Sequence, residues 1–319
     1  VSSSQHIRLT EAAVSAVRVS HLPLYSCKYS KKTYTQHHQL VLLLLKERLG
    51  QDYRGFTDLV EVMDPMRQLL HGENIPHFTT LHKFLQRLSS LWLTLIQKRV
   101  VASLYQRGAV ISVTAIDASG FTSAYASCYS SLRTGKTRKR FLKVSLAVDT
   151  TTQVILAIAM TQHPISEVRM ARSLLAQSHR TRKAACYVLD KGYDAESIQR
   201  RIREEMQAES LIPVRTRNRK RIHGRYRREM ARTFDARRYH RRNLVETAFS
   251  VLKRTLGESL KARTYRLQAK EIKLKIILYN LKRTIAPYSM QILVIISTEP
   301  GIINFNIPAW MALPGPPDR

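Results

Sequence analysis

The first third of the chain has the apolar spacing of short helices. The run Leu40–Leu45 leads through a charged stretch to Gly50, which predicts a buried helix closed by a glycine cap. Two shorter apolar groups predict further short helices over Phe56–Val62 and Met66–Leu70. This part of the chain is therefore expected to be mostly helical.

A longer helix is predicted after Pro76. Thr79 and its neighbour offer a cap, and the apolar positions over 81–95 recur at helical spacing. Residues 1–105 are thus predicted to form a helical N-terminal domain. Short helices joined by tight turns suit a helix-turn-helix DNA reader, and they suit a plain packing or oligomerisation domain equally well.

After residue 109 the residue pattern changes from that of helices to that of β-strands. Five β-rich runs follow, at Val110–Asp117, Phe141–Val148, Gln153–Ala159, Ala185–Leu189 and Leu211–Val214. The polar residues 149–152 predict a hairpin between the second and third runs. Helical stretches are expected at Ser166–Ser178, at Asp194–Gln207 and at about 268–284.

This order of elements predicts a known architecture. Three strands, a helix, a strand, a helix and a strand, followed by a further helix, match a ribonuclease-H-like α/β fold with a mixed five-stranded sheet and flanking helices. We assign this predicted domain to residues 106–287. The remaining residues, 288–319, form an apolar, proline-rich tail to which the sequence gives no role.

The net charge of the chain indicates which kind of molecule it binds. The chain of 319 residues carries a formal net charge of +30, which favours binding to nucleic acid, although anionic lipid or ribosomal RNA would also suit a basic surface. The three cysteines have no metal-ligand spacing, so a reducing compartment and no structural zinc are expected. The longest apolar runs are too short to span a membrane. We expect a soluble, cytoplasmic, nucleoid-associated protein with no membrane partner and no small-molecule substrate.

Residues 215–242 are unusually basic. Runs of like charge are commonly solvated loops, but this one leads directly into a predicted helix that carries an acid, which favours a loop that contacts DNA. Its basic residues are Arg215, Arg217, Arg219, Lys220, Arg221, Arg225, Arg227, Arg228, Arg232, Arg237, Arg238, Arg241 and Arg242.

Three acidic residues stand out by position. Asp117 and Asp190 each end a predicted strand, and the two strands are expected to be central neighbours in the sheet. Glu246 lies in the pattern Tyr239-x2-Arg242-x3-Glu246-x6-Lys253, which at about 100° per residue falls on one stripe of a single predicted helix. The adjoining stripe is apolar and would face the core, with Val245, Phe249, Leu252 and Leu256.

The chemistry of this set suits phosphodiester cleavage. Carboxylates hold Mg²⁺ or Mn²⁺, and two such ions can stabilise both the attacking and the leaving oxygen of an in-line displacement. Arg242 can clamp a phosphate, Lys253 offers a mobile charge and Tyr239 can bond a phosphate or stack on a base. Each residue alone also has a plain structural explanation, as a turn, a cap or a salt-bridged helix surface.

Neighbouring charged residues receive different roles. We expect Asp149 to belong to the hairpin turn, and Asp194 and Glu196 to the start of a helix, where acids favour the helix dipole. Gly192 would permit a tight exit from the strand. From their position in the sequence, Lys191, Arg238 and Arg241 are expected to approach DNA phosphates.

The motifs around these acids resemble those of DDE transposases of prokaryotic insertion sequences, in the group named for a Y-R-E-K signature. The three segments that carry the resemblance are Ala115–Phe121, Leu189–Glu196 and Arg242–Lys253 with the upstream Tyr239, and Ile75–Leu81 is similar to the N-terminal helical region of related enzymes. The resemblance covers roughly residues 35–285.

The resemblance implies a function. It implies metal-dependent cleavage at element ends by Asp117, Asp190 and Glu246, strand transfer of the 3′-hydroxyl into target DNA, and a homodimer acting on double-stranded terminal repeats. The interval between Asp190 and Glu246 is short for the large β insertion of some members, which leaves the hairpin route of end release open. A nuclease of the same fold without strand transfer, and an inactive DNA-binding relic, remain alternatives.

Overall fold

The computed structural model describes residues 4–70, 74–105, 108–123, 141–163, 167–215 and 222–285. Its centre is a mixed sheet in the order β3-β2-β1-β4-β5, with the short β6 added to the far end of β1. β1 pairs antiparallel with β2 and parallel with β4. The strands are β1 (Ile111–Ser123), β2 (Phe141–Asp149), β3 (Ile155–Thr161), β4 (Ala184–Leu189), β5 (Glu209–Leu211) and β6 (Ser259–Leu260).

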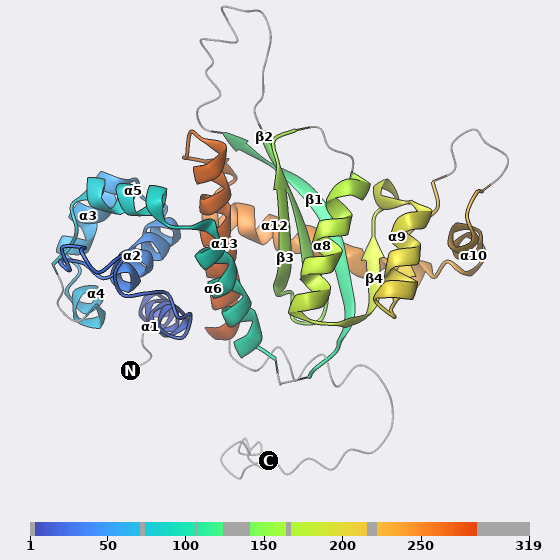
Figure 1. Ribbon diagram of the computed structural model, residues 1–319, viewed down its shortest axis with the longest axis horizontal. Helices are drawn as coiled ribbons and strands as arrows, with labels where there is room; N and C mark the ends of the chain where they lie inside the picture. The colour runs from blue at the N-terminus through green and yellow to red at the C-terminus, as the bar shows by residue number, and fades with distance from the viewer. Residues whose placement is uncertain are drawn as a thin grey trace, which may run out of the picture. The chain divides into compact units, whose positions relative to one another are not determined.

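Helices cover both faces of this sheet. Figure 1 shows α8 (Glu167–Thr181) in front of the strands and α12 (Asn243–Leu256) behind them. The apolar side chains of α8, such as Leu174, pack against Ile116 and Ala147. Those of α12 and α13 (Tyr265–Ile285) pack against the opposite face, which includes Val144. The predicted ribonuclease-H-like arrangement of five strands with flanking helices is confirmed.

The first 105 residues are helical, as predicted. The Leu40–Leu45 run lies in α2, every one of these residues is buried, and Gly50 closes the helix with φ of 66°. The predicted short helices are present as α3 and α4. The helices of this part are α1 (Gln5–Arg18), α2 (Gln36–Leu49), α3 (Tyr53–Glu61), α4 (Asp64–Leu69), α5 (Phe78–Arg87) and α6 (Ser90–Ser103).

The prediction of one long helix over 81–95 is wrong. The chain turns extended at Leu88, and Ser89 begins α6 by accepting a hydrogen bond from the backbone N–H of Leu91 at 3.3 Å. The buried Lys270 of α13 donates to the carbonyls of Leu85 and Gln86 at 2.7 and 2.9 Å. The break therefore exposes the carbonyl end of α5 to a lysine from a distant helix, and helical spacing alone cannot reveal that partner.

α13 belongs to two cores at once. Leu274, Ile277 and Leu278 pack with the N-terminal helices, whereas Ile272 and Ile276 pack with the sheet. The contacts accordingly join Val1–Ile285 into one compact unit. The division of the chain at residue 105 into a helical and a catalytic domain stays an interpretation of the sequence.

The strand boundaries differ from expectation at two places. β1 runs to Ser123, so Asp117 lies in the middle of the strand and not at its end; the second half of β1 is kept extended by pairing with β2 and β6. The last strand is predicted at Leu211–Val214, but β5 lies earlier, at Glu209–Leu211. The helix predicted at Asp194–Gln207 is divided into α9 (Glu196–Arg200) and a π-helical turn at Arg201–Glu205.

The basic segment is partly helical and not only a loop. It contains α10 (Arg225–Thr233) and α11 (Ala236–Tyr239), while 216–221 and the predicted tail 288–319 lie outside the described residues. The helices seen in the described ranges include none with the length and apolar character needed to cross a membrane.

Candidate active site

Two of the three acids are neighbours in the sheet. β1 and β4 run parallel, and Ile116 pairs with Leu189, so Asp117 within β1 and Asp190 directly after β4 both follow a paired position. Asp117 accepts a hydrogen bond from the backbone N–H of Ala118 at 2.7 Å. The sequence prediction that these two residues lie on adjacent central strands is confirmed.

The third acid arrives on α12, but the predicted single helix from Tyr239 to Lys253 is wrong. α11 ends at Tyr239, a 3-10 turn follows at His240–Arg242, and α12 begins at Asn243. The apolar stripe predicted for this helix does face the core, since Val245 and Leu252 are fully buried. α12 is thereby held against β1, with Glu246 in its first turn.

Arg242 joins two of the acids directly. Its Nη1 lies 2.6 Å from Oδ2 of Asp117, and its Nη2 lies 2.6 Å from Oε1 of Glu246. The side chains of Arg242 and Asp117 are 18% and 19% exposed, so this ion pair is largely shielded from water, whereas Glu246 is about half exposed. One guanidinium therefore spans carboxylates that are far apart in the sequence.

Tyr239 contacts the remaining acid. Its hydroxyl donates to Oδ1 of Asp190 at 3.3 Å, and its ring lies beneath the guanidinium of Arg242, 5.9 Å from the centroid. Burial and the nearby charge of Asp190 raise the pKa of Tyr239 to about 12, so the phenol keeps its proton at neutral pH. A protonated phenol can donate a hydrogen bond to a carboxylate or a phosphate oxygen.

The surroundings of Asp117 change its pKa. Burial raises its pKa above the ordinary value, and the negative charges of Asp190 and Glu246 add to the increase. The Ala118 N–H and Arg242 act in the opposite direction. The carboxylates are thus close enough to repel one another, which is the condition that a bound cation relieves.

The donor set fits a hard divalent cation in its chemistry. Three carboxylates against the one guanidinium of Arg242 leave a net negative charge, and carboxylate oxygens are preferred by Mg²⁺ and Mn²⁺. As the side chains stand, no three His, Cys, Asp or Glu residues in the described ranges form a group that could hold a metal ion. Asp117, Asp190 and Glu246 are the residues that would hold such an ion, and Arg242 forms ion pairs with two of them.

The comparison with known families agrees with this geometry. The family described as transposase DDE domain matches residues 108–281, which include all strands of the sheet, α12 and most of α13. The chain belongs to the transposase DDE domain family. No curated protein sequence matches the chain.

Four predicted site residues lie outside this side-chain cluster of the DDE domain. Lys253 pairs with Glu258 at 2.9 Å, and Arg238 pairs with Glu209 at 2.6 Å. Lys191 and Arg241 are exposed. Their predicted contacts with DNA remain predictions.

The acids expected to be structural have hydrogen-bond partners that support local structure. Asp149 accepts hydrogen bonds from Tyr105 and Thr152 in the β2–β3 hairpin. Asp194 forms two hydrogen bonds with the guanidinium of Arg227, at 2.9 and 2.7 Å. Glu196 accepts from two backbone N–H groups at the start of α10 and so caps that helix.

Sequence reasoning missed a fourth acid beside the cluster. Glu167, in the first turn of α8, pairs with Lys143 of β2 at 2.8 Å. A methyl group placed on Gly192 would lie 1.9 Å from Oε2 of Glu167 and 3.7 Å from Oδ2 of Asp190. The glycine therefore gives space to the carboxylate of Glu167 close to Asp190, and an acid at the start of a predicted helix gave no signal of that contact.

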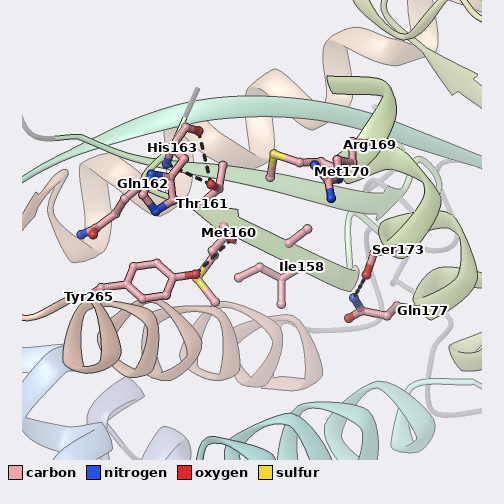
Figure 2. Close-up of a pocket in the computed structure, with 11 residues that line it drawn as sticks. Ile158, Met160, Thr161, Gln162, His163, Arg169, Met170, Ser173, Gln177 and Tyr265 are labelled. Atoms are coloured by element: carbon pink, nitrogen blue, oxygen red, sulfur yellow. Dashed lines mark hydrogen bonds between the residues drawn. The ribbon is translucent and has the colours of Figure 1, made fainter. Parts of the chain in front are cut away.

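A separate pocket of about 570 Å³ lies at the β3 edge of the DDE domain, between α8 and α13. Figure 2 shows Tyr265 donating to the backbone carbonyl of Met160 on one side and Gln177 bonded to Ser173 on the other. No acidic residue lines this pocket. It therefore offers no carboxylate that could take part in the chemistry of the three acids.

Proposed function

We propose that the protein is a transposase of the Y-R-E-K group, which cuts DNA at the ends of an insertion sequence and joins the 3′-hydroxyl to target DNA. The observation that carries the proposal is the single network of Asp117, Asp190 and Glu246 with Arg242 and Tyr239. Carboxylates with a phosphate-binding cation and a phenol beside them suit phosphodiester chemistry.

Asp117, Asp190 and Glu246 would hold the divalent cations, most simply two Mg²⁺ or Mn²⁺ ions. When bound, such ions activate the attacking oxygen and stabilise the leaving one. The chain itself fixes the three carboxylates: two strands of one sheet carry the aspartates, and α12 carries the glutamate across them. A rigid sheet and a packed helix limit how far the oxygens can drift.

The basic side chains would hold the DNA. Arg242, with its planar fork, can bind one phosphate at two oxygens, and Tyr239 can donate to another. Further backbone phosphates would be bound by Lys191 and Arg241. Lys253 and Arg238 would also bind phosphates, once they have left their acidic partners Glu258 and Glu209. The helical residues 1–105 would bind the terminal repeats or pair two copies into a homodimer.

Asp117→Asn and Glu246→Gln test the catalytic assignment. Either change should abolish Mn²⁺-dependent cleavage of a supercoiled plasmid that carries the element ends, because each removes a carboxylate from the cluster. Salt-sensitive DNA binding, measured by gel shift, should persist, since the basic surface is untouched. Unchanged cleavage in both variants would refute the assignment.

A strand-transfer assay with pre-cleaved ends separates the alternatives. Joined product is the expected result for a transposase. Cleavage without joined product favours a nuclease of the same fold. DNA binding with neither cleavage nor joining favours an inactive relic.

A further inference from the structure

We infer that Arg242 and the catalytic divalent cation compete for Asp117 and Glu246. When a DNA phosphate binds Arg242 in place of these carboxylates, the carboxylates become free to bind the metal ion. The inference rests on the proposed function and concerns how the same site is regulated. Free protein would then hold its carboxylates closed on Arg242. Protein bound to DNA would hold them open to metal.

The first step is positional. The two terminal nitrogens of Arg242 lie 2.6 Å from Oδ2 of Asp117 and 2.6 Å from Oε1 of Glu246. The guanidinium therefore holds one oxygen of each carboxylate, and a divalent ion shared by Asp117 and Glu246 would be repelled by its charge and would have to displace it to use Oδ2 and Oε1. The two cations therefore exclude one another at Oδ2 and Oε1, and in the described ranges no three His, Cys, Asp or Glu side chains form a group that could hold a metal ion as they stand.

The second step concerns the stability of the closed arrangement. The Nε of Arg242 is buried and has no hydrogen-bond partner in the described structure. A buried donor without a partner destabilises the arrangement that buries it. Glu246, one of the two acceptors, is 53% exposed, so water weakens that half of the bridge. The two ion pairs of Arg242 stabilise the closed state, while the unpaired Nε and the exposure of Glu246 weaken it.

The third step identifies what opens it. Guanidinium groups bind phosphate bidentately, in the same geometry that they use for carboxylates. The side chain is anchored in a short 3-10 turn between α11 and α12, and exposed arginines flank it on this segment. A DNA backbone bound along these arginines offers Arg242 a phosphate in exchange for its carboxylates. By linkage, DNA must then raise the affinity for metal, and metal must raise the affinity for DNA by the same factor.

The test measures metal binding rather than catalysis. Mn²⁺ binding to the full chain is followed by the electron paramagnetic resonance signal of the free ion, without DNA. Arg242→Gln should bind Mn²⁺ more tightly than wild type, on the order of 5- to 150-fold, the usual range for two coupled sites. Arg254→Gln removes the same charge from an exposed position of α12 and is the matched control, with wild-type affinity expected.

Two further measurements separate exchange from simple charge removal. Arg242→Lys keeps the charge but cannot span both carboxylates, so it should also bind Mn²⁺ more tightly than wild type. Adding a short duplex of random sequence, with a blank of duplex alone, should tighten Mn²⁺ binding in wild type and not in Arg242→Gln. Circular dichroism confirms that each variant is folded.

Equal Mn²⁺ affinity in wild type and Arg242→Gln would overturn the inference, as would equal tightening in the Arg254→Gln control. This failure is distinct from failure of the proposed function. A protein that cuts and joins DNA but shows no change in Arg242→Gln lacks only the competition. A protein with tighter metal binding in that variant but no joined product retains the competition and lacks the transposase activity.

Discussion

Side chains at the site show which contacts a sequence can predict. The bridge from Arg242 to Glu246 follows from a spacing of four residues, which places both on one side of a helical turn. The bridge from Arg242 to Asp117 spans 125 residues and depends on how α12 crosses the sheet. The acids could therefore be predicted from their motifs, but the ion pair between Arg242 and Asp117 could not.

Cysteine reactivity is a prediction at the same scale. Burial raises the pKa of Cys186 to about 11, while Cys27 is exposed. Because the thiolate is the reactive form, iodoacetamide at pH 8 should modify Cys27 readily and leave Cys186 unmodified. Peptide mass spectrometry after timed labelling checks this. Raising the pH toward 10 should begin to label Cys186 if the fold persists, and rapid modification of Cys186 at pH 8 would contradict its burial.

Helices and strands were predicted well where local pattern decides and poorly where a distant partner does. The buried helix α2, the β2–β3 hairpin and the order of strands all follow from spacing and turn residues. The break between α5 and α6 depends on Lys270, and the extension of β1 depends on pairing with β6. These partners lie more than 130 residues away, beyond the reach of any local rule.

Gly224, which precedes α10, tests how that helix is started. Its φ of 100° is strained for other residues, and an added methyl group would lie 2.1 Å from Oε2 of the capping Glu196. Gly224→Ala should therefore destabilise the protein by about 1–3 kcal/mol and increase hydrogen exchange over 225–233.

Gly120→Ala is the matched control for this change. An added methyl group there meets only Phe141 at 3.7 Å, an ordinary contact, so chemical denaturation should show a neutral or slightly stabilising effect. Equal effects of the two alanines would show that the start of α10 is not constrained as described.

The lysine that closes α5 predicts a pH dependence. Burial lowers the pKa of Lys270 from 10.5 to about 8. Between these two values the unfolded chain holds a proton that the folded chain releases, so this residue makes the free energy of unfolding rise with pH in that window. Below pH 8 both states hold the proton and this dependence vanishes.

Urea denaturation at several pH values measures the effect. The difference in unfolding free energy between wild type and Lys270→Met should increase from pH 8 to pH 10 in favour of wild type. Lys98→Met, at an exposed position of α6, should show no such change. A difference that is flat across this window would mean that Lys270 titrates normally.

At the scale of the whole molecule, charge governs the encounter with DNA. A net charge of +30 in a chain of 319 residues, with exposed arginines along α10, should make affinity for duplex DNA strongly salt-dependent. For six to ten phosphate contacts, affinity should fall about 10³- to 10⁵-fold between 50 and 200 mM salt. Fluorescence anisotropy with a labelled duplex measures the slope. A nearly flat dependence would show that the basic surface does not meet the backbone.

The whole fold was predictable because its layers repeat a simple rule. Short β-rich runs predicted the strands of the sheet, and helical apolar stripes predicted the helices that cover it, including Val245 and Leu252 of α12. What the sequence could not supply is how the N-terminal helices join the sheet, since that union is made by α13 from the other end of the chain.

Because α13 packs in both hydrophobic cores, its late position in the chain has a consequence for folding during translation. During translation, residues 265–285 are among the last of the described chain to leave the ribosome, and until then neither hydrophobic core is closed. Asp117 and Asp190 can be paired in the nascent sheet, yet α12 lacks the helix against which it packs. The cluster of Asp117, Asp190 and Glu246 therefore lacks part of its packing until residues 265–285 have been made.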